Sequence, residues 1–153
     1  MGELIHQQGS FDVSSNAIVL SDPCHEINAP VNFVCPAQNG TWDIDSIGMV
    51  YLRCYLQGCD LSKYQRRFLG YVCVDSGTIS CFDKKYYNPD KYDSMIEKTW
   101  TGLVIVPGGC LIPTGTGDGP YEVYFYTNDN NEVVGIEYDL DFTEEQILND
   151  ETW

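Results

Sequence analysis

The apolar residues of this chain recur at every second position or in short solid runs, and Gly, Pro, Asn or Asp interrupts them about every ten residues. Helical spacing of apolar residues is scarce. The pattern is typical of short strands joined by tight turns, so we expect a mostly β protein, an antiparallel β barrel or sandwich with one or two short helices. The sequence has no linker, repeat or low-complexity tract, and we expect residues 1–153 to form a single β-rich domain.

Turn residues and alternation locate the individual elements. Strands are expected within residues 11–22 (two, separated at Ser14–Asn16), 31–35, 40–45, 47–56, 66–74, 78–83 and 101–113 (with a bend at Pro107–Gly109). Residues 121–142 are expected to form a hairpin of two strands about Asn128–Asn131. Asp75-Ser76-Gly77 has hairpin turn chemistry, and we expect it to pair the strands on either side of it. Short helices are expected in the second half of residues 84–100, capped by Asp90 or Asp93, and after Thr143, where Gln146 completes a capping box.

Alternation also predicts which side chains face the core. Within residues 47–56 the apolar or small set is expected to face inward: Gly48, Val50, Leu52, Cys54 and Leu56. In the strand that begins at Tyr121, we expect Tyr121 and Val123 on one side and Glu122 and Tyr124 on the other. Before it, Gly117 and Gly119 are expected to be structural, with at least one of them at positive φ.

The charge is strongly acidic, with a formal net charge of −15. Every Lys and Arg lies at or before Lys98, so residues 99–153 carry a formal charge of −11. Such a field repels nucleic acid and anionic membranes and attracts basic surfaces. We therefore expect no direct nucleic-acid or membrane binding and a basic protein surface as partner, while solubility alone is the simpler interpretation.

The seven cysteines are odd in number and scattered, mostly in apolar surroundings, which indicates reduced core thiols rather than a disulfide framework. No C-x-x-C is present and the only histidines are His6 and His25, so a structural zinc site is not expected. Residues 1–13 lack the features of a signal peptide, and no stretch reaches the length of a transmembrane helix. A cytoplasmic location is expected.

Three stretches, "IVLSDPC", "GYVCVDSGTISCFD" and "GTGDGPYEVYFY", together resemble a family of bacterial and phage proteins catalogued only as a domain of unknown function. The residues that match its motifs are Ser21, Asp22, Pro23, Cys24, Val74, Asp75, Gly77, Gly117, Asp118, Gly119, Tyr121, Val123 and Tyr124. His25, Cys73 and Glu122 stand where that family has Tyr, Gly and Pro. The resemblance implies a single domain and a bacterial or phage origin, and it brings no established activity.

The strongest ligand-site candidates are aspartates beside glycine-rich turns. The stretch "GTGDGPYEVYFY" has no Lys and leads into a strand, so it is no phosphate-binding loop, and the spacing of an EF-hand is absent. Asp22, Asp75 and Asp118 each sit in a turn beside a strand, where converging carboxylates can bind a divalent cation. Alternatively, Asp22 and Asp75 only stabilise their turns. Cys24 and His25 are neighbours, which on a strand would point to opposite faces and not act together.

Two functions remain open. The first is a non-catalytic acidic binding protein that engages or inhibits a basic, nucleic-acid-binding partner in bacterium–phage conflict. Its expected contact residues are Asp139, Asp141, Glu144, Glu145, Asp150 and Glu151, with Tyr86 and Tyr87 as aromatic anchors. The second is a small-ligand or nucleotide-signal binding protein, or a weak cation-dependent hydrolase, that uses Asp22, Asp75 and Asp118 with Tyr121 stacking on the ligand. No cofactor is expected beyond a divalent cation, and no catalytic residue is assigned.

Overall fold

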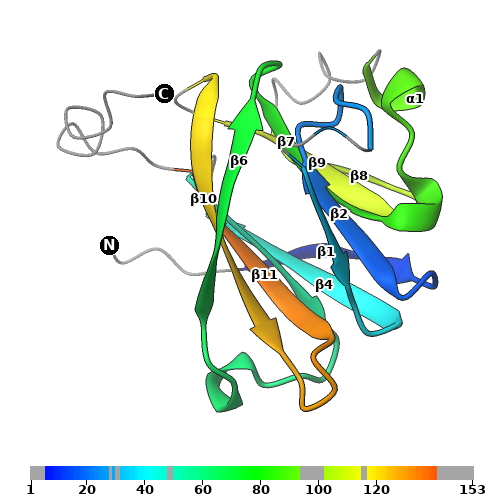
Figure 1. Ribbon diagram of the computed structural model, residues 1–153, viewed down its shortest axis with the longest axis vertical. Helices are drawn as coiled ribbons and strands as arrows, with labels where there is room; N and C mark the ends of the chain where they lie inside the picture. Colours follow the sequence, from blue (N-terminus) through cyan, green and yellow to red (C-terminus); the bar gives the residue numbers. More distant parts are fainter. Residues whose placement is uncertain are drawn as a thin grey trace, which may run out of the picture.

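The computed structural model describes residues 6–27, 29, 32–47, 50–93, 102–114 and 117–140. Two antiparallel sheets pack against each other as an open β sandwich (Figure 1). The mostly β fold predicted from alternation is therefore confirmed, in the form of a sandwich rather than a closed barrel. Among the described residues, no helix is long and apolar enough to cross a membrane.

The larger sheet has six strands in the order β1-β4-β5-β11-β10-β6. Their bounds are β1 His6–Val13, β4 Gly40–Ile47, β5 Tyr51–Leu56, β11 Val133–Asp139, β10 Gly119–Thr127 and β6 Arg67–Val74. The smaller sheet has the order β3-β2-β7-β9-β8, with β3 Phe33–Pro36, β2 Ala17–Ser21, β7 Thr78–Asp83, β9 Gly109–Pro113 and β8 Val104–Val106. Within the described ranges, three short helical segments lie between strands: η1 Leu61–Lys63, η2 Lys84–Tyr86 and α1 Pro89–Asp93.

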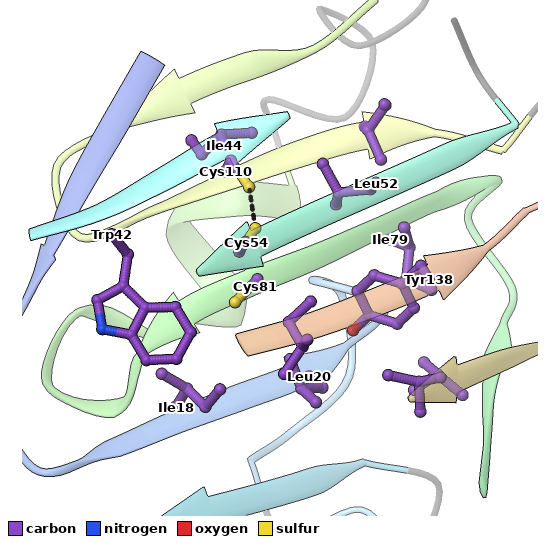
Figure 2. Packing of buried hydrophobic residues seen from close by; sticks show 14 of the residues in the cluster. Ile18, Leu20, Trp42, Ile44, Leu52, Cys54, Ile79, Cys81, Cys110 and Tyr138 are labelled. Carbon is purple, nitrogen blue, oxygen red and sulfur yellow. Dashed lines mark hydrogen bonds between the residues drawn. The ribbon is translucent and has the colours of Figure 1, made fainter. Parts of the chain in front are cut away.

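The core lies between the two sheets and draws on both. Leu20 and Ile79 from the smaller sheet pack with Trp42, Leu52 and Tyr138 from the larger one (Figure 2). The buried Tyr138 hydroxyl donates a hydrogen bond to the Ser80 carbonyl at 2.9 Å. This bond satisfies the only polar group of the Tyr138 side chain and ties the sheets together, because the two residues belong to different sheets.

Cysteine side chains fill part of this core. Cys54, Cys81 and Cys110 lie together between the sheets, with 3.8 Å between the sulfurs of Cys54 and Cys110 (Figure 2). None of the seven cysteines, all of which lie in the described ranges, forms a disulfide, and Cys35 is the fourth that is buried. The sulfurs therefore act as small apolar groups, as their sequence surroundings indicate.

Side-chain parity in the strands follows the alternation. Leu52 and Cys54 are fully buried, and so are Tyr121 and Val123, whereas Glu122 and Tyr124 lie on the opposite face of β10. The predicted hairpin of β10 and β11 is present, with Asn131 at a φ of 61° in its turn. Gly117 and Gly119 have φ values of 87° and 142°, which confirms the expectation of positive φ.

Two local predictions were wrong about connectivity. The segment 47–56 is not one strand, because β4 ends at Ile47 and β5 begins at Tyr51; Val50 lies in the turn and is 37% exposed. The turn Asp75–Gly77 does not close a hairpin, because β6 belongs to the six-stranded sheet and β7 to the five-stranded one. It carries the chain from one sheet to the other.

The short helix α1 also differs from the expectation at its start. It begins at Pro89, and the side chain of Asn88 accepts from the backbone N–H groups of Asp90 at 3.1 Å and Lys91 at 3.4 Å. Asn88, rather than Asp90 or Asp93, therefore caps the helix, since proline suits the first helical position. The helix predicted after Thr143 lies outside the described residues.

Candidate functional site: an acidic apex built from three turns

Three turns meet at one end of the sandwich, and we call residues 22–27, 75–77 and 117–119 the apex. The first turn follows β2, the second joins β6 to β7, and the third leads into β10, which begins at Gly119. The backbone N–H of Thr114 donates to the Gly77 carbonyl at 2.9 Å, and a Cβ placed on Gly77 would lie 3.9 Å from Oδ1 of Asp118. The fold thus brings the turns of Asp22, Asp75 and Asp118 together at the same end of the molecule.

Asp22 lies at the base of the apex and is fully buried. Its Oδ1 accepts from the Cys24 N–H at 3.0 Å and from the Ser76 hydroxyl at 2.7 Å. Its Oδ2 accepts from the N–H groups of Asp75 and Ser76, both at 2.7 Å. The carboxylate therefore stabilises its own turn and also clamps the turn between β6 and β7.

These contacts determine the charge state of Asp22. Burial by itself raises the pKa of a carboxyl group, but the hydrogen bonds from Cys24, Ser76 and Asp75 favour the charged form and lower it. The net pKa of Asp22 lies below the ordinary value, so the group is ionised at neutral pH. A negative charge is thus fixed under the apex.

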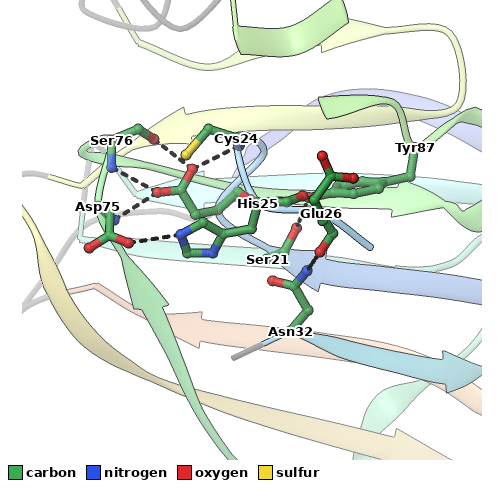
Figure 3. A network of polar contacts seen from close by, with 9 residues as sticks. Ser21, Cys24, His25, Glu26, Asn32, Asp75, Ser76 and Tyr87 are labelled. Carbon is green, nitrogen blue, oxygen red and sulfur yellow. Dashed lines mark hydrogen bonds and ion pairs between the residues drawn. The ribbon is translucent and has the colours of Figure 1, made fainter. Parts of the chain in front are cut away.

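His25 and Asp75 form an ion-pair contact at the surface of the apex. Nε2 of His25 lies 2.8 Å from Oδ2 of Asp75, and the side chains are 15% and 78% exposed, respectively (Figure 3). The other ring nitrogen, Nδ1, is buried and has no hydrogen-bond partner among the described residues. One edge of the imidazole is therefore held by a carboxylate while the opposite nitrogen is enclosed.

Cys24 and His25 are not on a strand, so the argument that they point to opposite faces was wrong. They lie in the turn that follows β2, where the chain reverses after Pro23. The donor atoms of Asp22, Cys24 and His25 all lie within 4.8 Å of one another. Sequence reasoning missed this group because it treated the segment as extended; the Asp-Pro pair was the available signal of a turn.

The two adjacent tyrosines have different roles. The Tyr87 hydroxyl accepts from the Ser21 hydroxyl at 2.9 Å and lies 2.6 Å from the His25 carbonyl, to which it donates. Tyr87 is only 9% exposed, so it does not occupy the surface position expected of a partner-binding residue. Tyr86 is 40% exposed and lines a shallow depression of about 380 Å³ with Phe11, Ile105 and Pro107.

Tyr121 supports the apex from below. Its ring is fully buried in the core, and its hydroxyl donates to the carbonyl of Gly117. Tyr121 thus holds the turn that carries Asp118, and its ring is not on a surface where a ligand could stack. Asp118 itself is exposed.

The apex has an excess of exposed carboxylates. Glu26, Asp75 and Asp118 are exposed, and the loops 22–32, 75–77 and 114–118 contain no Lys or Arg. Of the acidic residues expected to bind a partner, Asp139 lies at the end of β11 and is partly buried. Asp141, Glu144, Glu145, Asp150 and Glu151 lie outside the described residues.

No family model matches this chain, and neither a curated protein nor a solved structure matches it. The geometry of the apex is therefore the basis for the functional argument.

Proposed function

We propose that this protein is a non-catalytic binding protein whose acidic apex engages a basic, nucleic-acid-binding protein surface. The observation that carries the proposal is the clustering of Glu26, Asp75 and Asp118 on turns that hold no Lys or Arg. Exposed carboxylates on one end of a rigid scaffold attract a cationic surface and orient it during encounter. The interaction is proposed to take place in bacterium–phage conflict.

Two arginines outside the apex are paired with carboxylates and leave the negative charge of the apex in place. Arg53 bonds to Asp45 at 2.6 Å and Arg66 to Glu137 at 2.6 Å, both on the six-stranded sheet and its flank. These arginines are neutralised by their own carboxylates, so they do not offset the charge of the apex. The turns themselves are held by Asp22 and Tyr121, which keeps the exposed carboxylates in place when a partner approaches.

The test compares two variants with the same net charge. Asp75→Asn with Asp118→Asn removes two charges from the apex, and Asp60→Asn with Asp129→Asn removes two exposed charges from other turns. Binding to a panel of basic nucleic-acid-binding proteins is measured by isothermal titration at low and at moderate salt. We expect the apex variant to bind about ten-fold more weakly, with a smaller salt dependence, and the control variant to bind as the wild type does.

A DNA duplex should compete for the partner, because both ligands would occupy its basic surface. An equal loss of affinity in the two variants would show that binding depends only on net charge. That result would overturn the assignment of the binding surface to the apex. The absence of any binding at low salt across the panel would overturn the proposed function.

A further inference from the structure

The turn Asp22-Pro23-Cys24-His25 gathers a carboxylate, a thiol and an imidazole. Their donor atoms lie within 4.8 Å of one another, and Cys24 and His25 are partly exposed. In a tetrahedral zinc site with one sulfur ligand, bonds of ordinary length separate the donor atoms by about 3.3–3.6 Å. A closure of at most about 1.5 Å, within the range of side-chain rotations, would therefore bring these donors to zinc-binding distances.

We propose that Asp22, Cys24 and His25 bind a transition-metal dication of the zinc class, with Asp75 orienting the His25 ring. The donor set selects this class, since thiolate and imidazole favour Zn²⁺ or Co²⁺ whereas Mg²⁺ and Ca²⁺ take oxygen ligands. The thiolate is the form of Cys24 that binds, and its proton passes to solvent.

The surrounding contacts hold the ligands as metal sites require. Ligating carboxylates and histidines are usually oriented by hydrogen bonds from the protein. Asp22 accepts from backbone N–H groups on both sides of the site, and Asp75 lies 2.8 Å from Nε2 of His25. The Tyr87 hydroxyl bonds to the backbone carbonyl of His25 at 2.6 Å, which fixes the turn itself.

The local charge also favours a cation. Asp22 supplies a carboxylate to the site, Asp75 is beside it, and Glu26 follows His25 in the chain. A dication would neutralise this group of charges without requiring any basic side chain, and the three loops supply none. Metal binding at this site does not require the proposed basic partner.

The test uses untagged, fully reduced protein and titrates it with Co²⁺, whose bond to a thiolate gives a charge-transfer absorption band. We expect saturation at one equivalent and displacement by Zn²⁺. Cys24→Ser should abolish the band and weaken Zn²⁺ binding at least about ten-fold, measured by competition with a chelating dye. Cys59→Ser is the matched control, because Cys59 is also a partly exposed thiol. It should leave the absorption band and the Zn²⁺ affinity unchanged.

His25→Gln separates metal binding from a folding defect, because it should keep the thiolate band and weaken affinity while circular dichroism stays unchanged. Absence of the band in the wild-type protein would overturn the proposed site. Equal losses of the band and of Zn²⁺ affinity in the Cys24 and Cys59 variants would overturn it as well. The proposed partner binding does not require the Cys24 thiol, so Cys24→Ser should retain it. Failure of one proposal is therefore distinguishable from failure of the other.

Discussion

Glu137 shows at the scale of one residue how this acidic chain keeps a carboxylate buried. It is 6% exposed on β11 and accepts from Nε of Arg66 at 2.6 Å and from the Tyr126 hydroxyl at 2.8 Å. Burial raises its pKa, but the hydrogen bonds from Arg66, Tyr126 and Tyr51 outweigh burial and leave the pKa below its ordinary value. The alternation of β11 predicts an outward Glu137, and its burial follows from Arg66, which precedes β6, and from tyrosines of the two neighbouring strands.

This lowered pKa predicts a pH dependence of stability. A carboxyl group with a depressed folded-state pKa stabilises the fold above its unfolded pKa of about 4.3, and the contribution is lost as pH falls through the folded-state value. Glu137→Gln should lower the free energy of unfolding by about 1–3 kcal/mol at pH 7 and by less below pH ~4. Urea unfolding of both proteins across this range measures the difference. A pH-independent difference between Glu137→Gln and the wild type would contradict the assignment.

At the scale of elements, the apex depends on a connection between the two sheets. β6 ends in one sheet and β7 begins in the other, and Asp22, which follows β2, binds the turn between them. The sequence signals of that turn are the same whether the next strand pairs with its predecessor or crosses to another sheet. This is why Asp75-Ser76-Gly77 was correctly predicted as a turn but wrongly predicted as a hairpin.

Asp22→Asn should therefore destabilise the whole fold. The amide would place an NH₂ group against N–H donors that now bond to a carboxylate, so buried donors would lose their acceptor. We expect the free energy of unfolding to fall by about 2–4 kcal/mol, measured by urea unfolding at pH 7. Asp75→Asn, at a position whose side chain is 78% exposed, should cost less than about 1 kcal/mol. Equal effects of the two substitutions would contradict the clamping role of Asp22.

At the scale of the whole molecule, the thiols report on the integrity of the sandwich. Cys35, Cys54, Cys81 and Cys110 are buried, and burial together with the neighbouring Cys81 raises the pKa of Cys35 to about 12. Thiolates, not thiols, react with disulfide reagents, so a buried thiol of high pKa is protected until the sheets separate.

A thiol-counting reagent such as Ellman's reagent should thus distinguish two classes in the native protein. Cys24, Cys59 and Cys73 are partly exposed and should react first, whereas the four buried thiols should react only at the rate of unfolding. Mass spectrometry of the partly labelled protein identifies the modified residues. Rapid labelling of Cys54 or Cys110 under native conditions would show that the core opens without global unfolding. In denaturant all seven should react.

The sequence by itself determined the properties that depend on neighbours along the chain. Alternation predicted most of the strands and the inward positions of Leu52, Tyr121 and Val123, because successive side chains of a strand point to opposite faces. Tertiary structure alone decided which strands pair, and therefore that the turns of Asp22, Asp75 and Asp118 meet. It also decided that Asp22 is enclosed by N–H donors and that Cys24 approaches His25. These features arise from contacts between residues far apart in sequence or from the path of a turn, and no local spacing encodes either.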